Sequence, residues 1–170
     1  IGIWGSSYSG GHVLHLAAID RRVKAVVAQV PLVHGWRNAQ RLMRGDVMNQ
    51  FIRSLQEYRL ARYNGAPVQY LNVVAPEGQP CALPTPDSYE FFTETADTLA
   101  PNWRNEITLE SMEAFLEYNP SSYIELISPT PLLLVVAEQD ELTPTDLAIE
   151  AFEKAREPKK LVIIPGGHFD

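Results

Sequence analysis

Long apolar runs, basic clusters and paired cysteines are all missing from this sequence. No apolar stretch approaches the roughly 18 residues of a membrane-spanning helix, and the N-terminus has no charged segment followed by a signal-like stretch. The net charge is -7, and Lys and Arg form no cluster that could follow phosphates or anionic lipid. We therefore expect neither nucleic acid nor a membrane surface as a partner.

The single cysteine, Cys81, excludes an internal disulfide. It has no second Cys and no paired His at metal-ligand spacing, so we expect no metal, and we expect no organic cofactor. The compartment and the oligomeric state are left open. What is present is a chain of 170 residues, 45% hydrophobic and 21% charged, which is enough apolar material for one core.

Three segments rich in Val, Ala, Leu and Ile lack polar alternation: Val23–Val33, Leu132–Val136 and Leu161–Ile164. This pattern is typical of parallel strands covered on both faces. A shorter apolar segment, Ile1–Trp4, precedes a turn of small residues, and helical patterns lie between the strands. A capping box with Pro at the first helical position is expected at Thr143–Asp146. The sequence predicts an α/β fold, with a doubly wound parallel sheet, flanking helices and right-handed crossovers.

We divide the chain into three parts. Residues 1–33 hold the turn, its helix and the following strand, and residues 128–170 hold the last two strands. Residues 34–127 are too long for an ordinary crossover, so we expect a mostly helical cap insertion. Within it, Gly65–Pro86 contains five prolines and is expected to be a loop. Because the chain opens inside an apolar strand segment, we expect it to be the C-terminal half of a longer protein.

Ser7 lies in the small-residue turn between the first strand and the first helix. A nucleophile elbow needs small residues two positions before and two after its serine, because the backbone turns too tightly for larger side chains. Gly5 and Ser9 occupy these positions, although the strict pattern has glycine at both. A Gly- and Ser-rich turn also occurs as a phosphate-binding or structural loop. Ser7 therefore needs support from residues further along the chain.

That support comes from an acid and a base that follow two later strands. In hydrolases with this elbow the order is Ser, then Asp or Glu, then His. Asp140 follows the strand Leu132–Val136, with Glu138 and Glu141 as rival carboxylates, and His168 follows the last strand. The carboxyl ends of parallel strands meet at one edge, where open α/β sheets bind ligands. We predict Ser7 as nucleophile, Asp140 as the acid and His168 as the base.

Other polar and aromatic residues have less certain roles. The backbone N–H of Tyr8 is a predicted oxyanion donor, while its side chain either shapes the site or packs. His12 and His15 lie on the helix after Ser7, where we favour packing. His34 and Trp36 follow a strand end and are the predicted residues of a substrate pocket, although their position alone does not decide this. The aromatic residues of 34–127 suggest an apolar pocket or the core of the cap.

These residues resemble the α/β-hydrolase superfamily, from the turn Gly5–Gly10 through Asp140 to His168, over the whole chain. More narrowly, Gly2–His12, Ala25–Pro31 and Asp140–Pro144 look like the dienelactone-hydrolase-like and acetyl-xylan-esterase-like group, with fungal polyketide-transferase-type hydrolases close by. X-Pro dipeptidyl-peptidases and acyl esterases, which are similar, also place Tyr after the serine, so that kinship stays open.

The resemblance implies a serine hydrolase that cleaves a small ester-like substrate, a carboxylic ester or thioester, through an acyl-enzyme. It also implies an upstream half that carries the second oxyanion donor. We therefore expect residues 1–170 alone to be inactive, with an exposed sheet edge at Ile1–Trp4 that favours aggregation. The alternatives are an acyltransferase or X-Pro-peptidase-like hydrolase with the same triad, and a non-catalytic binding protein of the same fold.

Overall fold

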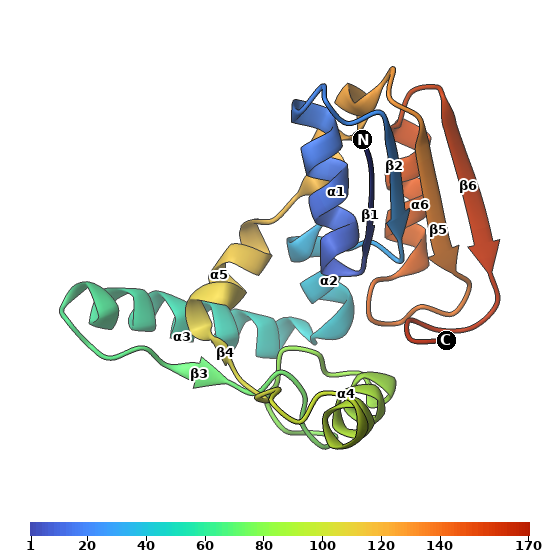
Figure 1. The fold of residues 1–170 in the computed structure, drawn as a ribbon. Coiled ribbons are helices and arrows are strands. Elements are labelled where there is room, and N and C mark those ends of the chain that lie inside the picture. The colour runs from blue at the N-terminus through green and yellow to red at the C-terminus, as the bar shows by residue number, and fades with distance from the viewer. The chain divides into compact units, whose positions relative to one another are not determined.

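The computed structural model describes all residues 1–170, and its central feature is a four-stranded parallel sheet (Figure 1). Across the sheet the strands are β1 (Gly2–Ser6), β2 (Ala25–Gln29), β5 (Leu132–Ala137) and β6 (Lys159–Ile164). Each neighbouring pair is parallel. The predicted fold class, parallel strands with flanking helices, is confirmed. β1 and β6 are the edge strands, so Ile1–Trp4 lies at an edge.

Three helical segments share one apolar core with the sheet: α1 (Tyr8–Ile19), the 3-10 helix η1 (Pro120–Ile127) and α6 (Thr145–Lys154). Leu14, Ile124 and Leu147, one from each, join Leu134 of β5 in this cluster. Burying one such side chain contributes roughly 1.5–3 kcal/mol. The cluster therefore holds the two segments on either side of residues 39–117 together.

Burial along the strands alternates, contrary to the expectation that both faces are covered. Val26 and Leu134 point into the core and are 1% and 0% exposed. Val27 and Leu133 point to the other face and are only half-buried, and Trp4 on β1 is exposed. Successive side chains of a strand point to opposite faces, so α1, η1 and α6 cover one face of the sheet within this chain.

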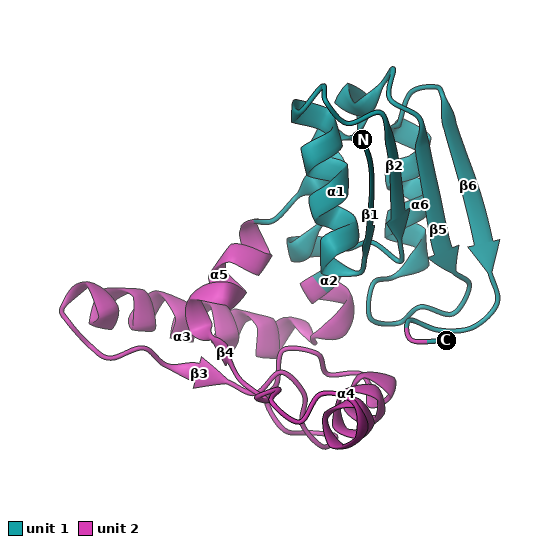
Figure 2. Cartoon of the chain, in the orientation of Figure 1, with its two compact units in different colours: residues 1–38, 118–168, 170 teal, residues 39–117, 169 magenta.

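The chain divides into two compact units, which Figure 2 shows in different colours. Unit 1 comprises residues 1–38, 118–168 and 170 and contains the parallel sheet. Unit 2 comprises residues 39–117 and 169 and is largely helical. The predicted cap bounds of 34 and 127 lie outside the bounds of unit 2, and its action as a cap stays a prediction.

Unit 2 contains three helices that it does not share with unit 1: α3 (Gly45–Tyr63), α4 (Pro86–Thr98) and α5 (Leu109–Glu117). The short helix α2 (Gly35–Leu42) crosses the boundary between the units. The sequence pattern does not predict α4, whose first residue is a proline and which buries little of its surface. Nor does it predict the two-residue strands β3 (Tyr70–Leu71) and β4 (Ile107–Thr108), which pair antiparallel. None of the helices is both long and apolar enough to span a bilayer.

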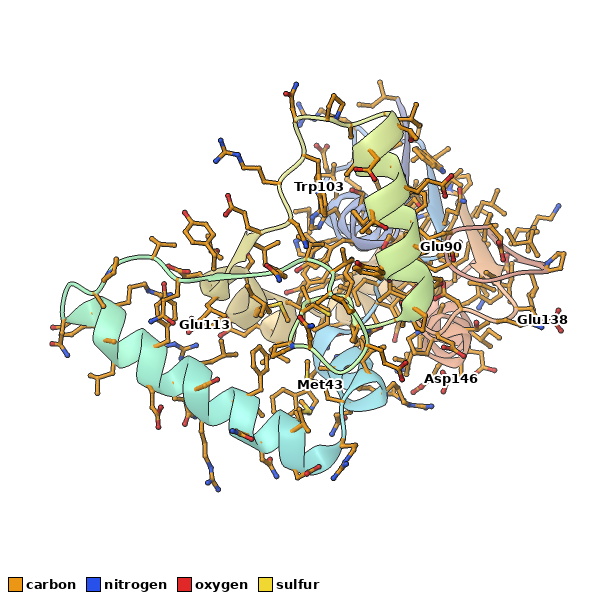
Figure 3. The ribbon with its side chains drawn as sticks, turned by 90° about the horizontal axis from the view of Figure 1, so that it is seen from below. Met43, Glu90, Trp103, Glu113, Glu138 and Asp146 are labelled. Atoms are coloured by element: carbon orange, nitrogen blue, oxygen red, sulfur yellow. The ribbon has the colours of Figure 1, made fainter.

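Arginines of α3 and glutamates of α5 form a charge cluster inside unit 2, with Glu113 labelled in Figure 3. Arg59 Nε and Arg62 Nη2 lie 3.3 and 3.4 Å from Glu113 Oε2. Arg62 Nη1 lies 3.2 Å from Glu110 Oε1. We call these four residues the α3–α5 charge cluster. It joins two helices that lie about fifty residues apart in the sequence.

Candidate active site

Ser7 lies between β1 and α1 in a backbone conformation that non-glycine residues rarely adopt, with φ 55° and ψ -122°. Its N–H donates to Gln29 O at 2.9 Å, and its carbonyl accepts from Leu32 N–H at 3.0 Å. A Cβ at Gly5 would lie 2.3 Å from Ser9 O, so this position admits only glycine. A strained residue held by hydrogen bonds to a neighbouring segment, here the end of β2, is typical of a functional turn.

Two further glycines let α1 approach the segment after β2. A Cβ at Gly11 would lie 2.3 Å from Leu32 O, and one at Gly10 would lie 2.9 Å from Pro31 Cβ. The small residues Gly5 and Ser9 indicate the turn from the sequence, whereas the packing role of this pair was not predicted. The sequence does contain a signal for this pair, since both glycines lie inside α1. Glycine there costs about 1 kcal/mol relative to alanine and is retained where packing requires it.

His168 lies on the loop after β6, which is hydrogen-bonded to the loop after β5. Gly166 has a φ of 102°, and its carbonyl accepts from Gln139 N–H at 2.9 Å. The Nε2 atom of His168 lies 2.9 Å from Ser7 Oγ, across a sequence separation of 161 residues. The glycine turn therefore brings the imidazole to the serine.

Asp140 completes a chain of hydrogen bonds that we call the Ser7 array (Ser7, His168 and Asp140). Its Oδ2 lies 2.8 Å from His168 Nδ1, and both side chains are 2% exposed. A buried carboxylate is costly unless hydrogen bonds satisfy its oxygens. The rivals Glu138, labelled in Figure 3, and Glu141 are exposed. The structure thus brings together the three residues that the sequence singled out.

Thr143 is a polar residue of this site that the sequence analysis assigned elsewhere. The capping box predicted at Thr143–Asp146 is wrong, because α6 begins at Thr145, with Pro144 at its N-cap and no side-chain cap bond. The N–H of Thr143 instead donates to Asp140 Oδ1 at 2.7 Å. Its hydroxyl lies 2.9 Å from Asp140 Oδ2. No sequence signal separates a threonine that caps a helix from one that orients a neighbouring carboxylate.

Tyr8 is the first residue of α1 and directly follows Ser7. Backbone N–H groups in the first turn of a helix point beyond its N-terminus, where the helix dipole favours negative charge. The Tyr8 ring stacks on Tyr118 with centroids 4.9 Å apart. Burial raises the pKa of the Tyr8 phenol. The side chain thus packs on one side while remaining 37% exposed.

The helix histidines contact aromatic residues of unit 1. His12 Nδ1 lies 2.7 Å from the Tyr118 hydroxyl, and the His15 ring meets Tyr123 edge-on at 4.6 Å. Burial, followed by the neighbouring Tyr8, raises the pKa of Tyr118, so this hydroxyl keeps its proton at neutral pH. Both histidines thus contact neighbouring aromatic residues, and a purely structural role for them stays a prediction.

His34 and Trp36, the predicted pocket residues, lie near α2 and α6. Burial lowers the pKa of His34, and the cations of Arg37 and Lys154 lower it further. Its Nδ1 is buried without a hydrogen-bond partner in the chain. Trp36, on α2, is 41% exposed. A pocket role for either residue stays a prediction.

The aromatic residues of unit 2 differ in their surroundings. Tyr58 is 4% exposed and belongs to the core of the unit, whereas Tyr63 is 88% exposed. Phe92 lies against Trp103, which is labelled in Figure 3, with ring centroids 5.4 Å apart. At least part of this set is therefore the unit's own packing.

The site contains a hydroxyl, an imidazole and a carboxylate. No group of three or more His, Cys, Asp or Glu side chains is arranged to hold a metal ion. The thiol of Cys81 is half-buried, and burial raises its pKa. An imidazole bonded to a hydroxyl on one side and to a buried carboxylate on the other can accept the hydroxyl proton.

The chain is similar to known proteins over its whole length. Residues 1–170 match the model of the family described as X-Pro dipeptidyl-peptidase (S15 family). The polyketide transferase grgF of Penicillium sp is 29% identical over 174 residues, which cover 100% of this chain and 55% of that protein. Its crystal structure, an α/β hydrolase, superposes with a TM-score of 0.77, over 100% of this chain and 56% of the other.

Two further proteins are similar over nearly the whole chain. The thiohydrolase aneE of Aspergillus aculeatus is 31% identical over 172 residues, covering 95% of this chain and 52% of that protein. The structure of DcsB in complex with its substrate analogue has 27% identity and a TM-score of 0.79, over 99% of this chain and 57% of the other. The chain thus spans about half the length of the relatives that it matches.

Proposed function

We propose, from the premise that this chain belongs to the X-Pro dipeptidyl-peptidase (S15) family of α/β-hydrolases, that it carries the serine nucleophile, base and acid of an ester-type hydrolase. One observation carries the proposal. The imidazole of His168 lies 2.9 Å from Ser7 Oγ and, through its other nitrogen, 2.8 Å from Asp140 Oδ2.

The reaction is an acyl transfer to water in two stages. Ser7 Oγ attacks the carbonyl carbon while His168 Nε2 takes the hydroxyl proton. The tetrahedral intermediate then expels the alkoxide or thiolate, which receives that proton, and leaves an acyl-Ser7 ester. A water molecule, deprotonated by His168, attacks this ester, and collapse releases the acid and restores Ser7.

Asp140 has two tasks in this scheme. It accepts the Nδ1–H of His168, which keeps Nε2 free to act as base, and it stabilises the imidazolium that forms during attack. Burial strengthens both effects, because the low exposure of the pair reduces screening by water.

Negative charge on the carbonyl oxygen requires hydrogen-bond donors. The N–H of Tyr8, at the N-terminus of α1, is the first proposed donor. We propose that a second donor lies outside residues 1–170 and that these residues alone are inactive, so the experiments use the full-length protein that carries them.

The proposed substrate is a small ester-like molecule, a carboxylic ester or a thioester. The relatives named thiohydrolase and polyketide transferase favour a thioester, and the second name also favours transfer of the acyl group to an acceptor other than water. Product analysis with competing alcohol and amine acceptors separates hydrolysis from transfer. Cleavage of an X-Pro peptide bond, the activity in the family's name, is tested by a chromogenic X-Pro amide.

Ser7→Ala tests the nucleophile. We expect the variant to hydrolyse a short p-nitrophenyl ester at least about 1,000-fold more slowly and to lose labelling by a fluorophosphonate probe, with an unchanged circular dichroism spectrum. Ser9→Ala, at an exposed residue of α1 two positions away, is the matched control and should retain both activities. Undiminished turnover in Ser7→Ala rejects the proposal, and a wild-type protein that resists the probe favours a non-catalytic binding protein.

A further inference from the structure

The hydroxyl of Thr143 lies among three polar atoms of unit 1. Its Oγ1 is 2.9 Å from Asp140 Oδ2, 3.0 Å from Val30 O and 3.2 Å from His168 Nδ1. Thr143 is 7% exposed, so these atoms, and not bulk solvent, surround the hydroxyl. The main chain of the same residue already holds the other carboxylate oxygen, Oδ1.

The number of available protons limits which hydrogen bonds the Thr143 hydroxyl can donate. If His168 Nε2 accepts the Ser7 proton, the Nδ1 atom carries the ring hydrogen and donates it to Asp140 Oδ2, the nearer of its two acceptors. Thr143 has a single hydroxyl proton and two acceptors at almost equal distance, Asp140 Oδ2 and Val30 O. The carboxylate is the stronger acceptor because it is charged.

We propose that Thr143 is a positioning residue of the Ser7 array, whose hydroxyl donates to Asp140 Oδ2 and holds that oxygen in line with His168 Nδ1. The inference rests on the proposed function, since it assigns Asp140 the task of orienting His168. Two donors from one residue, the N–H and the hydroxyl of Thr143, then fix both oxygens of the carboxylate. The plane of the carboxylate cannot rotate without breaking one of them.

The backbone of Val30 provides the other acceptor near this hydroxyl. Val30 has a φ of 37°, which is unusual for a β-branched residue, and its N–H donates to Val135 O at 2.7 Å. Its carbonyl, which follows β2, thus meets the hydroxyl of a residue that follows β5. Because the hydroxyl has a single proton, Val30 O competes for it with Asp140 Oδ2, while the branched Cβ of threonine restricts the side chain.

Three substitutions in the full-length protein test the proposal. Thr143→Val keeps the shape and removes the hydroxyl, and Thr143→Ser keeps the hydroxyl. Thr145→Val is the matched control, because Thr145 lies two residues further along, at the start of α6, and its hydroxyl donates to the main-chain Ala137 O at 2.6 Å. The measurements are kcat and KM on a p-nitrophenyl ester, the melting temperature, and the proton resonance of the His168 Nδ1–H.

We expect Thr143→Val to lower kcat roughly 10- to 100-fold, the effect of losing one hydrogen bond to a charged group. KM should change less than about threefold, because the hydroxyl acts on the array and not on the substrate. The Nδ1–H resonance should shift or broaden. Thr143→Ser should restore most of kcat, and Thr145→Val should retain kcat and the resonance even where its melting temperature falls.

The outcomes separate this inference from the proposed function. Full kcat and an unshifted resonance in Thr143→Val, with Ser7→Ala inactive, overturn the positioning role and leave the nucleophile intact. A loss of kcat in Thr145→Val equal to that in Thr143→Val also overturns it, since the loop would then act only through stability. Undiminished turnover in Ser7→Ala overturns the proposed function first.

Discussion

The Ser7 array of unit 1 and the α3–α5 charge cluster of unit 2 are both partly buried polar networks, yet their geometry differs. In the array, neighbouring groups meet at 2.8 and 2.9 Å, and Thr143 binds both carboxylate oxygens. In the cluster the ion pairs are 3.2–3.4 Å long, and Glu110 Oε2 and Glu113 Oε1 are buried without hydrogen-bond partners.

The two networks differ in what they require: the array depends on the direction of its hydrogen bonds, and the cluster depends only on the attraction of opposite charges. The proposed proton transfer needs each donor aimed at its acceptor, and the bonds of the array are short enough for it. Attraction between helices needs only opposite charges at close range, which looser contacts provide. We therefore expect substitutions in the array to change activity and substitutions in the cluster to change stability.

The largest effect on kcat is expected when the acid of the array, Asp140, is replaced. Asp140→Asn keeps an oxygen for the Thr143 N–H but presents an amide to His168 and favours the wrong tautomer, which should lower kcat about 10,000-fold. Steady-state kinetics on a p-nitrophenyl ester measures the loss. Glu138→Gln and Glu141→Gln, at exposed carboxylates, are the controls. If either control loses as much activity as Asp140→Asn, the acid has been misassigned.

A smaller effect is expected in the α3–α5 charge cluster. The side chain of Glu113 is 10% exposed, and Glu113→Gln should lower the free energy of unfolding by about 1–3 kcal/mol, since it removes the charge that two arginines share. Urea denaturation measures the change, and kcat should stay within about twofold. The control is Glu117→Gln, whose side chain is 77% exposed and which should cost less than about 0.5 kcal/mol. An inactive but fully stable Glu113→Gln would contradict the separation of roles.

The smallest effect is expected for the ion pair between Asp20 and Arg22, which lies at the surface and outside both networks. Hydrogen bonds from Arg22 lower the pKa of Asp20 from 3.8 to about 2. A carboxyl group with a depressed folded-state pKa stabilises the fold above pH 3.8, and this contribution disappears as the pH falls toward 2. NMR titration of the Asp20 carboxyl should show this pKa, and Arg22→Ala should return it toward 3.8. An unchanged pKa in Arg22→Ala would assign the shift to another cause.

Much of unit 1 could be predicted from local patterns. Apolar runs identify β2, β5 and β6, and the small residues around Ser7 indicate the strained turn, because each pattern expresses a constraint within a few residues. The helices and strands of unit 2 are harder to predict from such local patterns. The helix α4 buries little surface, so its sequence has no strong apolar stripe, and β3 and β4 are too short to show alternation.

Residues 7, 140 and 168 could be chosen as candidates from the sequence because chain order and strand ends restrict where a nucleophile, an acid and a base can meet. Thr143 was not found as a partner of Asp140. Its neighbours Pro144 and Thr145 are equally typical of a helix start, and sequence spacing does not contain the direction in which a hydroxyl points.

The primary structure of this chain thus sufficed for the parallel strands, the turn at Ser7 and the choice of three side chains, because apolar runs and steric limits are properties of neighbouring residues. The folded chain was needed to show that one face of the sheet is covered and that the Thr143 hydroxyl lies between Asp140 Oδ2 and Val30 O. Hydrogen bonds depend on tenths of an ångström and on angles between segments more than a hundred residues apart, and these follow from packing.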